Sequence, residues 1–301
     1  MTAVIEVNDL TKDYGSGRGI FDVSFQVEQG EVFGFLGPNG TGKTTAIRHL
    51  MGFLNPGKGQ ASINGLVCNQ HMATILKDVG YLPGEIELPA GLTGSEFIQM
   101  MRGLRGISDT RNADELLDTF QLDPSGKTKR MSAGEKRKLA LVTAFMGDPE
   151  ILLLDEPTSG LDPLMQQTFI DFLLAEKQRG RTILLSSHMF SEVDSVCDRV
   201  AIIKDGMIVS TVKVTDIRHS RHKTYEVQFA SEPESASFLR EREFDSAAAG
   251  PCTVKVSIDD ALISTLLRVL DTYQVASLRE IKYTLEDYFL HFYAAPVEVS
   301  A

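Results

Sequence analysis

A glycine-rich stretch at residues 37–45 carries the strongest chemical signal in the sequence. It reads Gly37, Pro38, Asn39, Gly40, Thr41, Gly42, Lys43, Thr44 and Thr45. Glycine admits backbone conformations that are closed to residues with a Cβ, so successive N–H groups can point at the oxygens of one anion. A lysine supplies positive charge and a threonine a hydroxyl for Mg²⁺. These residue types at these offsets predict a phosphate-binding loop for a nucleoside triphosphate.

Two adjacent carboxylates follow an apolar run. Residues 151–154 are Ile, Leu, Leu and Leu, as in a parallel strand covered on both faces, and Asp155 and Glu156 come next. In an open α/β sheet, ligands bind at the carboxyl edge of the strands. We therefore expect Asp155 to hold Mg²⁺ and Glu156, which points elsewhere, to orient a water.

Three further side chains could complete such a site. His188 follows a second buried-strand pattern at 182–186 and could hydrogen-bond a γ-phosphate and the catalytic carboxylate. Ser132 could cap a helix at 136–146 whose first N–H groups face an anion, although an ordinary helix start fits equally well. Tyr14 lies between the first two strands, where its ring could stack on a purine or simply pack.

The elements that must position these side chains predict an α/β core. A helix is expected at 43–51, and strands are expected at 4–7, 21–28, 31–36, 60–64, 79–82, 151–154, 182–186, 200–203 and 207–209. The first two strands read as antiparallel, with Phe21, Val23, Phe25 and Val27 on one face. Residues 85–145 read as a helical insertion, in which Thr93 and Glu96 form a capping box.

The character of the sequence changes beyond Thr215. Strands are expected at 225–229, 252–258 and 275–281, and helices at 261–270 and from Thr284 onward. The last helix carries the aromatic residues Tyr288, Phe289, Phe292 and Tyr293, which are typical of a core rather than of a partner surface. We therefore predict two domains, an α/β domain at 1–215 and a small α+β domain at 216–301 that lacks a catalytic constellation.

Composition excludes several classes of protein. The chain has 301 residues, a net charge of −11 and no apolar run of the roughly 18 residues that cross a bilayer. Its N-terminus lacks a secretory pattern, so we expect it to stay in the cytoplasm. The acidic charge argues against nucleic acid as a partner. Residues 218–223 form a basic run that suits either a solvated linker or a contact with anionic lipid. Cys68, Cys197 and Cys252 suit buried thiols.

Taken in order, the motifs resemble those of the ATP-binding subunit of an ATP-binding cassette (ABC) transporter. Residues 37–45 resemble the Walker A loop, 131–135 the family signature, 151–156 Walker B with its catalytic glutamate, 159–162 the D-loop and His188 the switch histidine. The resemblance covers roughly residues 1–215 and implies a P-loop NTPase fold with a mixed sheet, antiparallel strands and a helical subdomain. More loosely, residues 278–290 resemble the C-terminal extension of bacterial drug and antibiotic exporters.

The resemblance also implies a mechanism. Lys43 contacts the β- and γ-phosphates, Thr44 and Asp155 hold Mg²⁺, and Tyr14 stacks on adenine. Two cassettes face each other head to tail, and each ATP lies between one phosphate loop and Ser132 and Gly134 of the other copy. Transport needs an integral membrane permease subunit docked near residues 84–104, which places the chain at the cytoplasmic face of the membrane. The cargo would be a drug, an antibiotic or another amphipathic compound.

Two departures from the family pattern keep alternatives open. Gly84 stands where a glutamine usually links Mg²⁺ and the attacking water to the membrane partner, and Glu85 could substitute for it. Ala133 and Glu135 replace a glycine and a glutamine of the signature, which adds a methyl group and a negative charge near a phosphate site. The rival functions are a soluble cassette protein that clamps a ribosome or DNA, and an ATP-gated interaction protein without hydrolysis.

Overall fold

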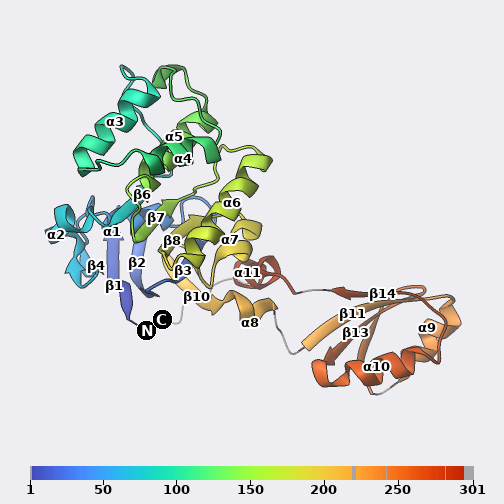
Figure 1. The fold of residues 1–301 in the computed structure, drawn as a ribbon. Coiled ribbons are helices and arrows are strands. Elements are labelled where there is room, and N and C mark those ends of the chain that lie inside the picture. Colours follow the sequence, from blue (N-terminus) through green and yellow to red (C-terminus); the bar gives the residue numbers. More distant parts are fainter. Residues whose placement is uncertain (1, 219–221, 242, 282, 295–301) are drawn as a thin grey trace. The chain divides into compact units, whose positions relative to one another are not determined.

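The computed structural model describes residues 2–218, 222–241, 243–281 and 283–294 (Figure 1). The chain divides into two units, Met1–Lys213 and Val214–Ala301. Part of the basic run at 218–223 lies outside the described residues. In the part of the chain that the structure covers, no helix has the length and apolar character needed to cross a membrane.

The first unit is built on a six-stranded sheet. In sheet order the strands are β10 (Met207–Lys213), β9 (Arg199–Lys204), β3 (Val32–Leu36), β8 (Thr182–Ser187), β7 (Ile151–Asp155) and β6 (Val79–Leu82). All neighbouring strands are parallel except the β9–β10 hairpin. Every residue of β3, β7 and β8 is buried, which confirms the prediction of strands covered on both faces.

A second, antiparallel sheet contains β2 (Gly19–Glu28), β1 (Ala3–Asp13), β4 (Lys58–Ile63) and β5 (Leu66–Val67), in that order. Its apolar side chains join those of the main sheet in one core, where the ring of Phe25 lies 5.5 Å from that of Phe33. The predicted alternation along β2 holds for Val23 and Phe25 but not for Phe21, which is only half-buried. Asp22 has a φ of 47°, and this irregularity turns Ile20 inward instead.

Four helices of the first unit flank these sheets: α1 (Lys43–Leu50), α2 (Cys68–Ile75), α6 (Pro163–Gln178) and α7 (Phe190–Val196). Only α1 is predicted from the sequence. The start of α6 nevertheless carries a local signal, because Asp162 accepts a hydrogen bond from the Met165 N–H at 3.0 Å and Pro163 begins the first turn.

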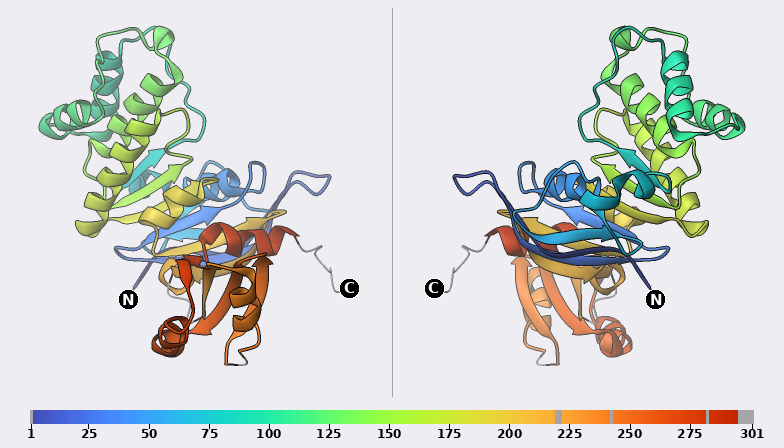
Figure 2. Two further views of the ribbon diagram at one scale, coloured as in Figure 1. Left: turned by 90° about the vertical axis from the view of Figure 1, so that its right-hand side faces the viewer. Right: turned by 90° about the vertical axis from the view of Figure 1, so that its left-hand side faces the viewer.

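The helical insertion contains α3 (Gly94–Arg105), α4 (Arg111–Thr119), a 3₁₀ turn η1 (Thr128–Arg130) and α5 (Ala133–Phe145), which lie together at one end of the unit (Figure 2). The predicted capping box of α3 is confirmed, with Glu96 N–H donating to Thr93 Oγ1 at 3.2 Å. Helix α5 begins three residues earlier than predicted because Ser132 caps it directly. This cap fixes the position of the signature-like turn.

The second unit contains α8 (Val214–Arg218), β11 (His222–Phe229), α9 (Glu232–Phe238), β12 (Asp245–Gly250), β13 (Thr253–Asp259), η2 (Asp260–Leu262), α10 (Ile263–Leu270), β14 (Val275–Ile281) and α11 (Leu285–Ala294). Its antiparallel sheet has the order β12-β13-β11-β14, so the βαββαβ run from β11 to β14 has ferredoxin-like topology. Helices α9 and α10 contribute Phe238 and Leu266 to its core.

Two packing predictions hold only in part. On α11, Phe289 is buried, but Tyr288, Phe292 and Tyr293 each keep part of their surface exposed. Cys68 and Cys197 are buried free thiols, whereas Cys252 is half-exposed, so the prediction of a buried thiol is wrong there. Cys252 lies in the turn that leads from β12 into β13, outside the interior of the sheet.

Candidate active site

The phosphate loop joins the end of β3 to the start of α1. Gly40 and Gly42 have φ values of 85° and 108°, which favour glycine, and a Cβ on Gly42 would lie 2.4 Å from Ile20 Cγ2. Gly42 is the N-cap of α1, and no side chain caps this helix end. The first-turn N–H groups therefore face the loop, where the helix dipole favours an anion.

A cavity of about 220 Å³ opens on this loop. It is lined by Tyr14, Arg18, Gly19, Asn39, Gly40, Gly42, Lys43, Thr44, Thr45 and Glu156. The structure thus brings most of the predicted loop, Tyr14 and Glu156 to one place. Gly37, Pro38 and Thr41 do not line the cavity. Instead they shape the loop, since Thr41 Oγ1 donates to the Pro38 carbonyl at 2.9 Å.

Lys43 is 4 % exposed and its ammonium group is surrounded by oxygen atoms. The Nζ atom donates to the carbonyls of Gly37 at 2.5 Å and Pro38 at 3.1 Å, and it lies 3.0 Å from Oε1 of Glu156. The loop thus holds a buried positive charge whose present partners are oxygen atoms that other oxygen atoms could replace. Phosphate oxygens are the same kind of partner, so the lysine fits its predicted role.

Asp155 is fully buried at the end of β7. Its Oδ1 accepts a hydrogen bond from Ser186 Oγ of the neighbouring β8 at 2.5 Å, whereas its Oδ2 has no hydrogen-bond partner among the described residues. A buried, unpaired carboxylate oxygen beside a triphosphate loop fits a divalent cation. In the described part of the chain, no three His, Cys, Asp or Glu side chains form a metal cluster. Mg²⁺ suits such a site, because it retains waters and takes substrate phosphates as ligands.

Glu156 and His188 face each other across the ends of β7 and β8. Nδ1 of His188 lies 2.6 Å from Oε2 of Glu156, while Oε1 of the same carboxylate pairs with Lys43. The backbone of Glu156 has a φ of 49°, a left-handed conformation held by N–H donation to the Ser186 carbonyl at 3.1 Å. Such strain is common at functional positions. The structure therefore brings the predicted glutamate and histidine together.

Ser132 and Gly134 lie away from the phosphate loop of their own chain. Ser132 caps α5, with Glu135 N–H donating to its Oγ at 3.2 Å and its own N–H donating to Glu135 Oε2 at 2.7 Å. Hydrogen bonding to the Ser132 backbone lowers the pKa of Glu135, so its negative charge stays at this helix start. Neither Ser132 nor Gly134 lines the loop cavity.

Gly84 lies against the carboxylate of Asp155. A Cβ at this position would be only 2.9 Å from the unpaired Oδ2, so a glutamine would fit here only with a shift of the loop or of the Asp155 side chain. Glu85 is exposed. Its substitution for the missing glutamine stays a prediction.

Three residues near the site were missed from the sequence alone. Ser186 lies opposite Asp155 in the β7–β8 pairing, a position that follows from the register of two buried strands. Arg137 and Glu192 are buried charged side chains on α5 and α7. In the sequence, each could have been noticed as a charged residue on the apolar face of a helix. Most partners of these side chains, however, lie in loops that are far away in the sequence.

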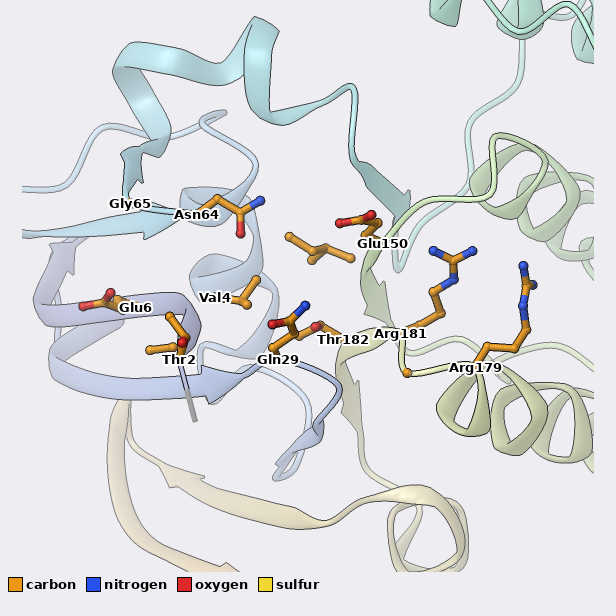
Figure 3. Close-up of a pocket in the computed structure, with 13 residues that line it drawn as sticks. Thr2, Val4, Glu6, Gln29, Asn64, Gly65, Glu150, Arg179, Arg181 and Thr182 are labelled. Carbon is orange, nitrogen blue, oxygen red and sulfur yellow. The ribbon is translucent and has the colours of Figure 1, made fainter.

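A larger cavity, of about 710 Å³, lies at the opposite, amino-terminal edge of the strands (Figure 3). Figure 3 shows Glu150, Arg179, Arg181 and Thr182 around it, from the segments that lead into β7 and β8. Asp148 and Glu176 pair with both arginines. None of the residues predicted to do chemistry lines this cavity.

Comparisons with known proteins agree with this geometry. A family model described as ABC transporter matches residues 20–159. An uncharacterized ABC transporter ATP-binding protein of Bacillus subtilis, YhcH, is 33% identical over 294 residues, 96% of each chain. The bacitracin transport ATP-binding protein BcrA of Bacillus licheniformis is 35% identical over 252 residues, 81% of each chain. A solved ATP-binding subunit of an ABC transporter has a TM-score of 0.66 and 32% identity, over 71% of this chain and 92% of that one.

The shared identity extends over nearly the whole length of the YhcH relative and includes the nucleotide-binding half of the chain. The fold is that of a P-loop ATPase cassette. The chain belongs to the ABC transporter family, as an ATP-binding cassette that hydrolyses ATP to power a transporter.

Proposed function

We propose that this cassette powers the export of a drug, an antibiotic or another amphipathic compound. The likeness to BcrA, whose name refers to bacitracin transport, supports this substrate class. The catalytic part of the proposal depends on one observation. Lys43, Glu156 and His188 form a connected cluster of contacts of 3.0 Å or less, next to the unpaired oxygen of Asp155.

Each residue of the cluster has a role in hydrolysis. Phosphate oxygens compete with Glu156 for the Lys43 ammonium, so nucleotide binding frees one carboxylate oxygen to accept a proton from an attacking water. His188 holds the other carboxylate oxygen in place and reaches toward the γ-phosphate. Held by Thr44 and Asp155, Mg²⁺ would neutralise charge on the β- and γ-phosphates. Tyr14, which is 54 % exposed and lines the cavity, stacks on the adenine.

The proposed active form is a dimer of cassettes. Ser132 and Gly134 lie at the N-terminus of α5, outside their own nucleotide cavity, as expected of groups that serve the ATP of a second copy. Head-to-tail pairing around a twofold axis gives both copies the same two contacts. ATP binding then stabilises the dimer, and hydrolysis releases it.

The proposed partner in transport is an integral membrane permease subunit, which would hold the cassette at the cytoplasmic face of the membrane. Helix α3 offers a docking surface, because Met100 and Leu104 lie four residues apart on one face and are 38 % and 75 % exposed. Contiguous exposed apolar surface marks interaction sites, and these two neighbouring side chains supply the apolar part of the proposed contact. No nucleic acid is part of this proposal, in keeping with the net charge of −11.

The test is Glu156→Gln, which keeps the size of the side chain and removes the base. We expect ATP affinity to stay within about twofold and turnover to fall by about two to four orders of magnitude. The matched control is Glu150→Gln, an exposed carboxylate at the opposite edge of the same sheet, which should leave turnover unchanged. Hydrolysis is measured as phosphate release, and affinity by calorimetry.

The same proteins separate the rival functions. Glu156→Gln with saturating magnesium-ATP should sediment as a dimer and the wild type mainly as a monomer. Membranes that contain the permease should stimulate wild-type turnover, whereas ribosomes or DNA should not. Turnover of Glu156→Gln at the wild-type rate would refute the catalytic assignment, and a wild type without hydrolysis under any condition would favour a non-hydrolysing interaction protein.

A further inference from the structure

Arg137 makes a network of hydrogen bonds that the catalytic roles above do not use. Its side chain lies on the second turn of α5, and the residue is only 6 % exposed. Nε donates to the carbonyl of Ser159 at 3.0 Å, Nη1 to that of Pro83 at 2.9 Å and Nη2 to that of Gly84 at 2.6 Å. One rigid, planar group thus holds two loops that are 75 residues apart.

Both loops lie beside the residues that carry the two carboxylates. The first loop places Gly84 against Asp155, where a Cβ would lie 2.9 Å from Oδ2. The second loop continues directly from Glu156, and Ser159 N–H donates to the Glu156 carbonyl at 3.1 Å. A displacement of Arg137 would therefore reach Asp155 through the close approach of Gly84, and Glu156 through its backbone carbonyl.

The same helix carries the signature-like turn. Gly134, one turn before Arg137, lies against the Gly160 carbonyl, which would be 3.1 Å from a Cβ on Gly134. Helix α5 therefore holds the 159–160 turn at two points, through the close packing of Gly134 and through the guanidinium of Arg137. The N-terminal turn with Ser132 is fixed in this way to the strand end that carries Asp155 and Glu156.

The charge of Arg137 is not neutralised by a direct ion pair in the described contacts. Burial lowers its pKa, whereas the nearby charges of Asp155 and Glu156 raise it. An arginine remains charged in this setting. Its three carbonyl partners therefore receive charge-assisted hydrogen bonds, which are stronger than neutral ones and hold the loops more tightly.

From this geometry we infer that Arg137 is a positioning residue that couples the two nucleotide sites of the dimer. It joins the turn that serves the partner's ATP to the carboxylates that act on the chain's own ATP. The inference rests on the proposed function. It also assigns a role to the loop at Gly84: with no side chain at this position, the loop is coupled to the site through its backbone carbonyl and Arg137.

The test compares Arg137→Gln and Arg137→Lys with the control Arg105→Gln. Arg105 is also a half-buried arginine of the insertion that binds backbone carbonyls, those of Val79 at 2.9 Å and Thr143 at 3.4 Å, but neither belongs to the loops at Gly84 and Ser159. We expect kcat of Arg137→Gln to fall about 10- to 100-fold, as for a displaced catalytic group, with KM for magnesium-ATP within about twofold. The phosphate loop, which sets KM, lies on other elements.

Rescue and dimerisation complete the test. Arg137→Lys keeps the charge but cannot hold three carbonyls at once, so its kcat should be intermediate. In the Glu156→Gln background, adding Arg137→Gln should raise the ATP concentration needed for dimerisation about tenfold, because the signature turn is no longer fixed. Arg105→Gln should lower the melting temperature as much as Arg137→Gln while keeping kcat within about twofold.

Three results would overturn the inference: an unchanged kcat in Arg137→Gln, a loss carried by KM alone, or an equal loss of kcat in Arg105→Gln. Failure of the proposed function is a different result, since the wild type would then hydrolyse no ATP or Glu156→Gln would remain active. The wild type and Glu156→Gln are therefore measured first with the same preparation.

Discussion

The two edges of the main sheet each have a cavity, and the predicted catalytic residues lie at the smaller of the two. The cavity at the amino-terminal edge has a volume of about 710 Å³, whereas the one at the phosphate loop has about 220 Å³. The predicted chemistry nevertheless belongs to the smaller cavity. In an open α/β sheet the carboxyl edge is the ligand side, so the polarity of the strands already favours it.

The difference between the edges is one of pairing. At the larger cavity Arg181 lies 2.6 Å from Asp148, and Arg179 lies 2.7 Å from Asp148 and 2.7 Å from Glu176. Burial raises the pKa of Asp148, but hydrogen bonds from Arg179 and Arg181 outweigh this and lower it overall. Asp148, Glu176 and the two arginines are thus paired with one another, although Nε of Arg181 has no hydrogen-bond partner among the described residues and lies 3.7 Å from Oε2 of Glu176.

At the carboxyl edge, polar groups are buried without such compensation. Oδ2 of Asp155 has no hydrogen-bond partner among the described residues, and the first turn of α1 has a glycine N-cap. An unpaired buried group costs free energy, and a ligand that pairs with it recovers that cost. The contrast teaches that an unpaired carboxylate oxygen beside an uncapped helix N-terminus, rather than empty volume, distinguishes the predicted site of this molecule.

The strongest way to test this contrast is Asp155→Asn. The amide oxygen can still accept from Ser186, but the amide nitrogen cannot ligate a cation where Oδ2 now lies. We expect kcat to fall by about three orders of magnitude, because the charge on the phosphates is no longer neutralised. Phosphate release across a range of Mg²⁺ concentrations is the measurement, with circular dichroism as the control for folding. Turnover within tenfold of the wild type would contradict the proposal that Oδ2 of Asp155 binds the cation needed for hydrolysis.

Local rules predict much of this edge. Glycine spacing predicts the phosphate loop, and the apolar runs predict β7 and β8. The residues after each run lie at the same edge of the sheet, so the sequence alone predicts that Glu156 and His188 lie close together, as the structure shows. These predictions succeed because a parallel strand that is buried on both faces must be apolar at nearly every position, which makes it easy to find in a sequence.

Other features depend on contacts that no local pattern reports. Arg137 binds carbonyls of loops 22 and more residues away, and those loops have no periodicity that indicates their direction. Helix α7 is short, and its sequence offers no side-chain cap. The strand order of the second unit depends on which hairpins pair. Burial along β13 alternates as predicted, whereas β12, whose residues are almost all exposed, is not predicted from the sequence.

A second buried carboxylate extends the comparison, because one of its oxygens also has no hydrogen-bond partner among the described residues. Glu192 is 1 % exposed; its Oε2 accepts from Ser187 Oγ at 2.5 Å, and its Oε1 has no partner among the described residues. Burial raises the pKa of Glu192 to about 7, against the hydrogen bond from Ser187, and the charge of Glu156 adds to the rise. Protonation thus compensates at Glu192 for what we propose that a cation supplies at Asp155.

The sign of the pH dependence follows from this raised pKa. Below pH 4.5 both the folded and the unfolded chain hold the proton, so the group costs nothing. Between about pH 4.5 and 7 the unfolded chain releases the proton while the folded chain still holds it, so the free energy of unfolding falls. Above pH 7 both states have released the proton, and the free energy of unfolding falls no further on account of this group. Glu192→Gln removes this loss, so its melting temperature should gain a few degrees on the wild type between pH 5 and pH 8. Glu150→Gln, at an exposed site, should show no such gain. A melting-temperature difference between Glu192→Gln and the wild type that stays constant from pH 5 to pH 8 would contradict the raised pKa of Glu192.

The smallest effect is expected at the amino-terminal edge, from Arg181→Gln. The change removes a charge that pairs with the half-exposed Asp148 and lies 3.7 Å from the buried Glu176, which keeps its bond to Arg179. Partly exposed pairs contribute about 1 kcal/mol, so the melting temperature should fall by about 2–4 °C. Because this pairing serves folding and not the nucleotide, kcat should stay within about twofold of the wild type. A fall in kcat at an unchanged melting temperature would mean that the two edges are coupled, and unpaired groups alone would then no longer mark where this cassette does its chemistry.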